Sequence, residues 1–177
     1  EVEGDLCDYL GINIRKREDG ALEMTQPQLI RSIIEDLGLN RPGTKTKTKP
    51  ALSSKILGKS LDEQPHDEKA FQYRSVIGKL NYLEKSTRPN IAYAVHQCAR
   101  FSSDPRQSHT EAVKYIGRYL MATSERGMVL NPNSNSFECW VDASHAGEWD
   151  KKEAPVEPAT AKSRSGYAIT LGGCPIL

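Results

Sequence analysis

Apolar residues in the middle of the chain recur every three or four positions, which is the spacing of one face of an α-helix. The stripe that they form consists of Tyr73, Val76, Ile77, Leu80 and Leu83. Pro89 interrupts the pattern, and a second apolar stretch continues to Phe101. The sequence therefore predicts two helices joined at a proline break, the first of which packs through this stripe.

Polar and aromatic residues occupy the opposite side of the first predicted helix. We call this set the polar ridge: Arg74, Gly78, Asn81, Tyr82 and Lys85. At ~100° per residue, Arg74, Gly78 and Tyr82 line up as a cation, a gap and a flat ring. A glycine inside a helix costs roughly 1 kcal/mol relative to alanine. Gly78 therefore either lets a neighbouring helix pack closely or leaves room for a ligand, and the ridge has a shape suited to a nucleic-acid groove.

Two short strands are predicted at the start of the chain. Residues 8–17 alternate weakly between polar and apolar side chains, and Glu18, Asp19 and Gly20 supply a turn. Residues 21–25 form the second strand. The pattern is typical of a β-hairpin.

A helix is predicted directly after this hairpin. Thr25 and Gln28 have the spacing of a capping box, Pro27 is tolerated in a first turn, and Gly38 suits the C-terminal end. The predicted buried face consists of Leu29, Ile30, Ile33, Ile34 and Leu37.

Residues 41–60 lack helical or strand periodicity and are bounded by prolines, which predicts a linker or surface loop. Between positions 41 and 59 the charged residues are all basic: Arg41, Lys45, Lys47, Lys49, Lys55 and Lys59. Lys45, Lys47 and Lys49 are candidates for contacts with backbone phosphates. The alternative is that this run of charge is merely solvated.

A further helix is predicted to open at Asp104 and Pro105 and to stop at Gly127. Its inner side consists of Val113, Ile116 and Leu120. Together with the two helices before it, this element predicts a small bundle. His96 and His109 belong to the same region and are interpreted as surface or packing residues, because no acidic or cysteine ligand recurs at metal spacing.

Beyond Gly127 the pattern changes to short stretches rich in branched and aromatic residues, MVL, FECWVDA and GYAITLGG, separated by polar loops. These stretches predict β-strands, and the change of pattern predicts the start of a second domain.

The composition is typical of a globular protein, with 37% hydrophobic and 27% charged residues and a formal net charge of +1. No apolar run approaches the ~20 residues that span a bilayer. The cysteines are Cys7, Cys98, Cys139 and Cys174, and no CxxC pair occurs among them. Neither a zinc site nor a disulfide framework is indicated, and reduced thiols are expected.

Two stretches resemble a known family. IGKLNY, at positions 77–82, is similar to the thumb helix of retroviral reverse transcriptases, and YRSVIGKLNYLEKSTRPNIAYAVHQCARF resembles the copia-type retrotransposon polymerase still more closely. The resemblance implies that Arg74, Gly78 and Tyr82 follow the minor groove of the template-primer. Asn81 and Lys85 belong to the same nucleic-acid-binding set.

FECWVDASHAG and SRSGYAITLGG resemble the first two strands of the copia-type ribonuclease H domain. Asp142 matches the family's first metal-binding carboxylate, which the resemblance makes a catalytic residue and a Mg²⁺ ligand. Without the resemblance, a lone aspartate at the end of an apolar strand is more often structural. The family's second aspartate and its tryptophan are replaced here by Ser144 and His145.

The resemblance implies an α+β chain in four parts. Residues 1–40 correspond to the end of the palm, with a hairpin and a helix, and residues 41–66 to a basic connector. Residues 67–126 correspond to the helical thumb, and residues 127–177 to the first strands of an incomplete ribonuclease H-like α/β domain. The implied function is to grip the primer-template duplex as part of a reverse transcriptase and ribonuclease H polyprotein.

The chain alone is expected to be inactive as an enzyme, because two-metal chemistry needs converging carboxylates and no Asp-Asp pair occurs in it. The expected partners are an RNA-DNA or DNA duplex and the rest of the Pol polyprotein, with no membrane. The expected location is intracellular, in a cytoplasmic virus-like particle or the nucleus. Two alternatives stay open: a non-catalytic helical interaction module, and a degenerate retroelement remnant.

Overall fold

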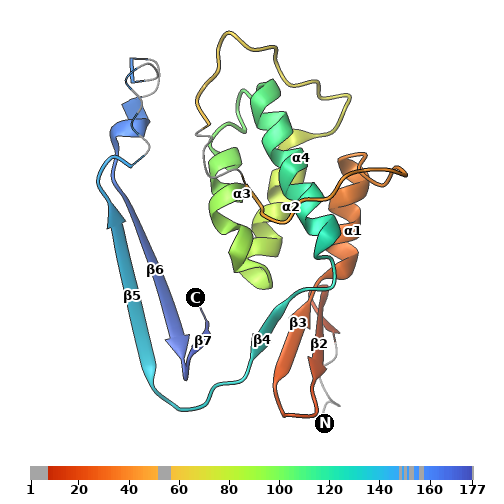
Figure 1. Cartoon of the computed structure of the whole chain (residues 1–177), viewed down its shortest axis with the longest axis vertical. Helices are drawn as coiled ribbons and strands as arrows, with labels where there is room; N and C mark the ends of the chain where they lie inside the picture. Colours follow the sequence, from red (N-terminus) through yellow and green to blue (C-terminus); the bar gives the residue numbers. More distant parts are fainter. Residues whose placement is uncertain are drawn as a thin grey trace. The chain divides into compact units, whose positions relative to one another are not determined.

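Helices and short strands alternate along the chain in the computed structural model, which describes residues 8–51, 57–147, 149, 151, 154–155 and 158–176. The described residues form two compact units (Figure 1). The first unit takes in the described parts of positions 1–14 and 24–128, and the second takes in positions 15–23 and the described parts of 129–177. The predicted α+β class is confirmed.

Four α-helices build the first unit: α1 (Pro27–Asp36), α2 (Tyr73–Ser86), α3 (Ala92–Ala99) and α4 (Gln107–Ala122). A 3-10 turn, η1 (Pro89–Ile91), joins α2 to α3 at the predicted proline break. The helices α1 and α3 each pack against both α2 and α4. The predicted stripe on α2 is confirmed, because all five of its side chains are buried. It joins buried apolar residues of the other three helices in one hydrophobic core.

The start of α1 differs from the prediction. Thr25 is the last residue of a strand, so Gln26 takes the N-cap position and makes no side-chain cap bond. The Gln26 side chain is buried instead, and its Oε1 accepts a hydrogen bond from the Thr87 hydroxyl at 2.9 Å. The predicted capping box is therefore wrong.

The predicted end of α1 at Gly38 is confirmed. Gly38 has a φ of +63°, in the left-handed region that glycine adopts without strain. The N–H groups of Gly38 and Leu39 donate to the carbonyls of Glu35 and Ile34, at 2.9 and 3.0 Å. These bonds form a Schellman motif, which satisfies carbonyls at the end of the helix.

The first predicted strand, residues 8–17, is in fact two strands, β1 (Asp8–Tyr9) and β2 (Ile12–Lys16). Leu10 and Gly11 have φ values of 52° and 74°, which are those of a two-residue type I′ turn. A third strand, β3 (Leu22–Thr25), follows the predicted turn, where Gly20 has a φ of +84°. With β4 (Met128–Leu130) the strands form a sheet in the order β1-β2-β3-β4.

The last helix also ends earlier than predicted. Its final residue is Ala122, with Thr123 at the C-cap, so Gly127 is not the stop. A Cβ atom on Gly127 would overlap the Met24 carbonyl oxygen and would lie 2.7 Å from Thr25 Cγ2. Gly127 is therefore required by the close approach of the chain to β3.

A buried arginine closes the C-terminal end of α4, and sequence reasoning did not single it out. Arg88 donates to the carbonyls of Thr123 and Arg126, at 2.8 and 3.3 Å, and to the Thr123 hydroxyl at 2.8 Å. Its guanidinium also lies 5.6 Å from the centre of the Tyr119 ring. Burial lowers the pKa of Arg88, and the neighbouring Tyr119 opposes that shift. An arginine side chain nevertheless stays protonated in proteins, so the cation complements the negative end of the helix dipole.

The second unit contains β5 (Phe137–Ser144), β6 (Arg164–Leu171) and β7 (Cys174–Pro175) in an antiparallel sheet of order β5-β6-β7. A 3-10 turn, η2 (Pro158–Ala161), precedes β6. Every side chain of β5 is exposed. Within the described ranges, none of the helices has the length and apolar character needed to cross a bilayer.

Candidate nucleic-acid interface

The polar ridge lies along one side of α2, opposite the buried stripe. Its side chains Arg74, Tyr82 and Lys85 are exposed, Gly78 is exposed between them, and Asn81 is half-buried. Tyr82 is 41% exposed although it is a large aromatic residue. The structure thus brings the five predicted residues together on one accessible helix face.

Hydrogen bonds to the backbone fix the two ends of the ridge. The Arg74 Nε donates to the Ser102 carbonyl at 2.8 Å, which orients the guanidinium. The Tyr82 hydroxyl donates to the carbonyl of Leu10, in the type I′ turn, at 2.7 Å. Because both side chains are already held in place, a ligand would bind them with a smaller loss of side-chain entropy.

Gly78 faces open space. A Cβ atom built on it meets no other atom of the described structure within 4 Å. Gly117, in α4, shows the contrast, because a Cβ there would lie 2.6 Å from Leu37 Cδ1 and 2.7 Å from Leu39 Cδ1. Gly117 is therefore a close-packing glycine, whereas close packing of a neighbouring helix does not account for Gly78. That alternative for Gly78 is wrong.

The three connector lysines line two different pockets. Lys45 and Lys47 line a polar pocket, whereas Lys49 lines a different, mostly apolar cavity. The Lys47 ammonium lies 5.1 Å from the centre of the Tyr115 ring, so this lysine is partly docked on α4. Lys55 lies outside the described residues.

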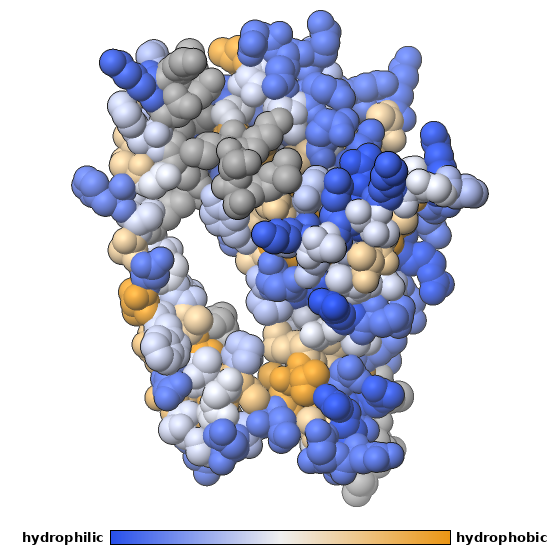
Figure 2. Space-filling model, in the orientation of Figure 1, coloured by the Kyte–Doolittle hydropathy of each residue, from blue (hydrophilic) through white to orange (hydrophobic). Residues whose placement is uncertain are grey.

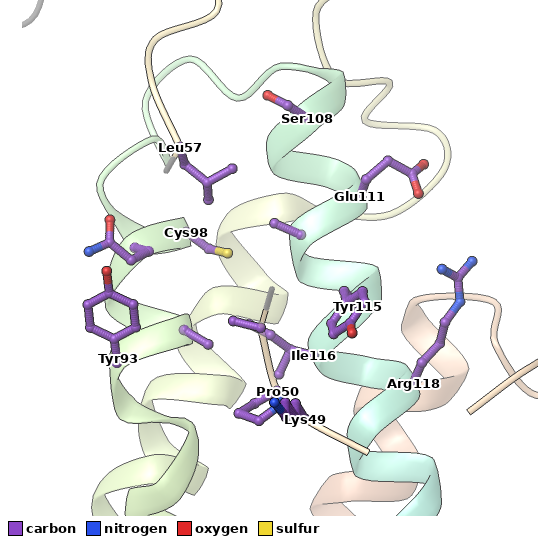
Figure 3. Close-up of a pocket in the computed structure, with 14 residues that line it drawn as sticks. Lys49, Pro50, Leu57, Tyr93, Cys98, Ser108, Glu111, Tyr115, Ile116 and Arg118 are labelled. Atoms are coloured by element: carbon purple, nitrogen blue, oxygen red, sulfur yellow. The ribbon is translucent and has the colours of Figure 1, made fainter. Parts of the chain in front are cut away.

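The apolar cavity has a volume of about 660 Å³ and lies between α3 and α4 (Figure 3). Leu57, Cys98 and Ile116 point toward it, whereas Glu111 and Arg118 extend away on the outer side of α4. Burial raises the pKa of the Cys98 thiol to about 12. A thiol that is protonated at neutral pH is a poor nucleophile, so cysteine chemistry is not indicated here.

We expect Cys98 and Cys139 to react with an alkylating reagent at very different rates in the folded protein. At about pH 8, a thiol with a pKa of about 12 has only ~1 in 10,000 molecules ionised, and Cys98 is also buried. Cys139 is exposed on β5. Brief treatment with iodoacetamide followed by peptide mass spectrometry should therefore label Cys139 and leave Cys98 unmodified. Unfolding in urea is the control, because both should then be labelled; equal labelling without urea would contradict the burial of Cys98.

The two histidines considered from the sequence, His96 and His109, both have structural contacts. His109 is buried, its Nδ1 accepts the Arg106 N–H at 2.9 Å, and its Nε2 lies 2.7 Å from the Gly58 carbonyl. The ring also stacks on Phe101 at a centroid distance of 4.0 Å. His96 lies 3.2 Å from the carboxylate of Glu84, which joins α3 to α2.

Asp142 is exposed on β5 and pairs in register with Gly166 of β6. Among the described residues, no group of three or more histidine, cysteine, aspartate or glutamate side chains is arranged to hold a metal ion. Mg²⁺ takes octahedral oxygen coordination and needs more than one protein ligand in a two-metal site. The residues present in the described structure therefore do not fit a magnesium centre.

Comparison with known proteins gives the class of the chain. No family model matches, and no solved structure matches. The chain is 31% identical over 176 residues to the retrovirus-related Pol polyprotein from transposon TNT 1-94 of Nicotiana tabacum, which covers 96% of the chain and 12% of that protein. It is 28% identical over 176 residues to a putative transposon Ty5-1 protein of Saccharomyces cerevisiae, covering 98% of the chain and 52% of that protein.

A third relative has a different kind of name. The chain is 34% identical over 104 residues to the secreted RxLR effector protein 161 of Plasmopara viticola, which covers 58% of the chain and 67% of that protein. The matches to transposon proteins, among them a further Pol polyprotein, show that the chain belongs to the copia-type retrotransposon Pol polyproteins. It spans about an eighth of the tobacco polyprotein and about half of the yeast protein.

Proposed function

We propose that the polar ridge of α2 contacts the minor groove of a primer-template duplex, as the thumb of a reverse transcriptase. The observation that carries the proposal is the open space at Gly78. An exposed glycine in the middle of a helix lowers stability by roughly 1 kcal/mol relative to alanine. No packing in the described structure offsets that loss, and close approach of a ligand backbone to α2 would offset it.

The side chains on either side of Gly78 suit the same ligand. Arg74 supplies a cation that can bind a phosphate, and the Tyr82 ring offers a flat surface for the sugars. Contacts of this kind carry no direct sequence information. They suit a polymerase, which holds every sequence in turn.

The order of elements supports a wider proposal about the parent polyprotein. A hairpin and α1 would belong to the end of the palm, the helices that follow to the thumb, and β5 to β7 to the start of a ribonuclease H domain. Asp142 would then be the first metal-binding carboxylate of that domain. The additional ligands for Mg²⁺ would come from other parts of the polyprotein.

The proposal is tested by replacing Gly78 with alanine. We expect the free energy of unfolding to rise by roughly 0.5–1 kcal/mol, because alanine favours the helix and its methyl group meets no atom of the fold. Duplex affinity should fall at least several-fold, because the methyl group occupies the space for the ligand backbone. Urea denaturation measures the first quantity, and fluorescence anisotropy with a labelled RNA-DNA duplex measures the second.

Gln28→Ala, on the exposed side of α1, is the matched control and should leave duplex affinity unchanged. The double variant Arg74→Ala, Tyr82→Ala should bind more weakly and lose roughly 0.9 from the salt slope, for one phosphate contact. Unchanged duplex affinity in a stabilised Gly78→Ala protein would refute the thumb assignment. Affinity that hardly varies with salt would instead favour the alternative of a protein-binding module.

A further inference from the structure

A second cationic surface lies on α4 and the connector, whereas the polar ridge lies on α2. A pocket of about 620 Å³ is lined by five basic residues, which we call the basic pocket: Arg41, Lys45, Lys47, Lys114 and Arg118. The remaining lining residues include Gly43, Thr44 and the end of α1, and none of them is acidic. On the face shown in Figure 2, hydrophilic side chains predominate over the helical unit.

The fold brings these cations together from two distant parts of the sequence. Lys114 and Arg118 are four residues apart on α4 and so share one helix face. Gly117 lets this part of α4 approach Leu37 and Leu39 at the end of α1. The connector is held against the helix by the Lys47 N–H, which donates to the Arg118 carbonyl at 3.2 Å.

The connector folds back on itself just before this contact. The Thr44 N–H and hydroxyl both donate to the Arg41 carbonyl, at 3.2 and 2.8 Å. Gly43 has a φ of +82°, which the turn requires. The positions of Arg41 and Lys45 at the pocket are thus fixed by backbone geometry rather than by chance contacts of long side chains.

Among the described residues, no carboxylate forms an ion pair with the cations of the pocket. No side chain of Arg41, Lys45, Lys114 or Arg118 has an ion pair or hydrogen bond within the described part of the chain. These basic side chains are not needed to cap the C-terminal end of α1, because its last carbonyls already accept backbone N–H groups in the Schellman motif. Like charges held close together repel one another, and a bound anion relieves that repulsion.

We propose that the basic pocket binds the phosphates of a nucleic-acid strand. Arginine forks and lysine ammonium groups are the side chains that bind phosphate, and the pocket presents both kinds without a competing carboxylate. Several cations around one concave surface suit the successive phosphates of a strand. The proposal does not rest on the polar ridge, because the ridge lies on α2 and the pocket on α4 and the connector.

The test compares two double variants that remove the same charge. In Lys114→Gln, Arg118→Gln the pocket loses its α4 cations; in Arg31→Gln, Lys59→Gln two exposed cations that do not line the pocket are lost. Anisotropy with a labelled single strand of about 12 nucleotides should show at least a tenfold loss at about 0.1 M salt for the first, and little change for the second. The salt slope should fall by about 1.4 in the first, for two lost phosphate contacts. Equal losses in the two variants would overturn the proposal.

A further double variant and a competition assay complete the test. Arg41→Gln, Lys45→Gln changes only exposed connector side chains and should give a similar loss, which covers the case in which the α4 variant does not fold. The Gly78→Ala test uses a duplex and this test uses a single strand, so a failure of the thumb assignment is distinguishable from a failure of the basic pocket. Inorganic tripolyphosphate should compete with the strand in the wild-type protein only weakly. If tripolyphosphate or ATP displaces the strand at equal phosphate concentration, the occupant is a free phosphate compound and the strand assignment is wrong.

Discussion

Replacing Arg88 by alanine is expected to lower the free energy of unfolding by about 3–5 kcal/mol. Arg88 is 2% exposed and donates to two carbonyls and a hydroxyl at the end of α4. Without it, the Thr123 carbonyl and hydroxyl each lose a charge-assisted hydrogen bond, at about 1.5–3 kcal/mol for each, while the carbonyl keeps the Arg126 N–H at 3.1 Å. The truncated side chain also leaves a cavity, which adds to the loss.

Urea denaturation of the wild-type and variant proteins measures this effect. The control is Arg31→Ala, which removes an exposed arginine from the same unit and should change stability by no more than about 0.5 kcal/mol. Arg88→Lys should recover only part of the loss, because an ammonium group lacks the planar fork that reaches several acceptors. A loss of less than about 1 kcal/mol in Arg88→Ala would mean that water replaces the guanidinium and that the end of α4 is not dry.

Replacing Gly127 by alanine is expected to destabilise the protein by about 1–3 kcal/mol. The added methyl group would overlap the Met24 carbonyl, which is backbone and so cannot rotate away as a side chain can. The chain would have to separate from β3 at this point. The pairing of β4 in the sheet should weaken as a result, and hydrogen exchange of its amides should accelerate.

The Gly78→Ala variant is the control that separates the effect of the close backbone contact from the effect of the added methyl group itself. The two substitutions are chemically identical, yet we expect opposite signs, because Gly78 faces open space and Gly127 faces backbone. Thermal or urea unfolding of the two variants side by side measures the difference. If Gly127→Ala is neutral, the close approach to Met24 is not maintained in solution.

Helix interiors were predictable from sequence because burial repeats with the helical period. The stripe on α2 shows this, since all five of its residues are in the core. Helix ends were less predictable. Arg88 closes α4 from a different part of the chain, so no local capping signal marks it, and Gly127 resembled a helix stop although its role is contact with Met24.

The first strand was predicted wrongly because the residues of its turn are unusual. A type I′ turn usually places asparagine, aspartate or glycine at its first central position, and here Leu10 occupies it at a φ of 52°. The Tyr82 hydroxyl bond to the Leu10 carbonyl helps to hold that conformation. It comes from a helix far along the chain, so the sequence around the turn gives no sign of it.

The polar ridge was predictable because its members share one helix. The basic pocket was only half predictable, since the connector lysines form a visible run whereas Lys114 and Arg118 are separated from it by two helices. The spacing of four residues between them was the available signal. Only the packing of α4 on the end of α1 shows that both sets meet.

The exposed strand β5 has a consequence for how the protein behaves at high concentration. It lies at one edge of its sheet, is eight residues long, and carries Phe137, Trp140 and Val141 exposed to solvent. A long apolar edge offers unpaired backbone groups to the same strand of another molecule. We expect association through this edge strand to limit solubility at high concentration, and Val141→Lys, which adds a charge to the edge, to improve it.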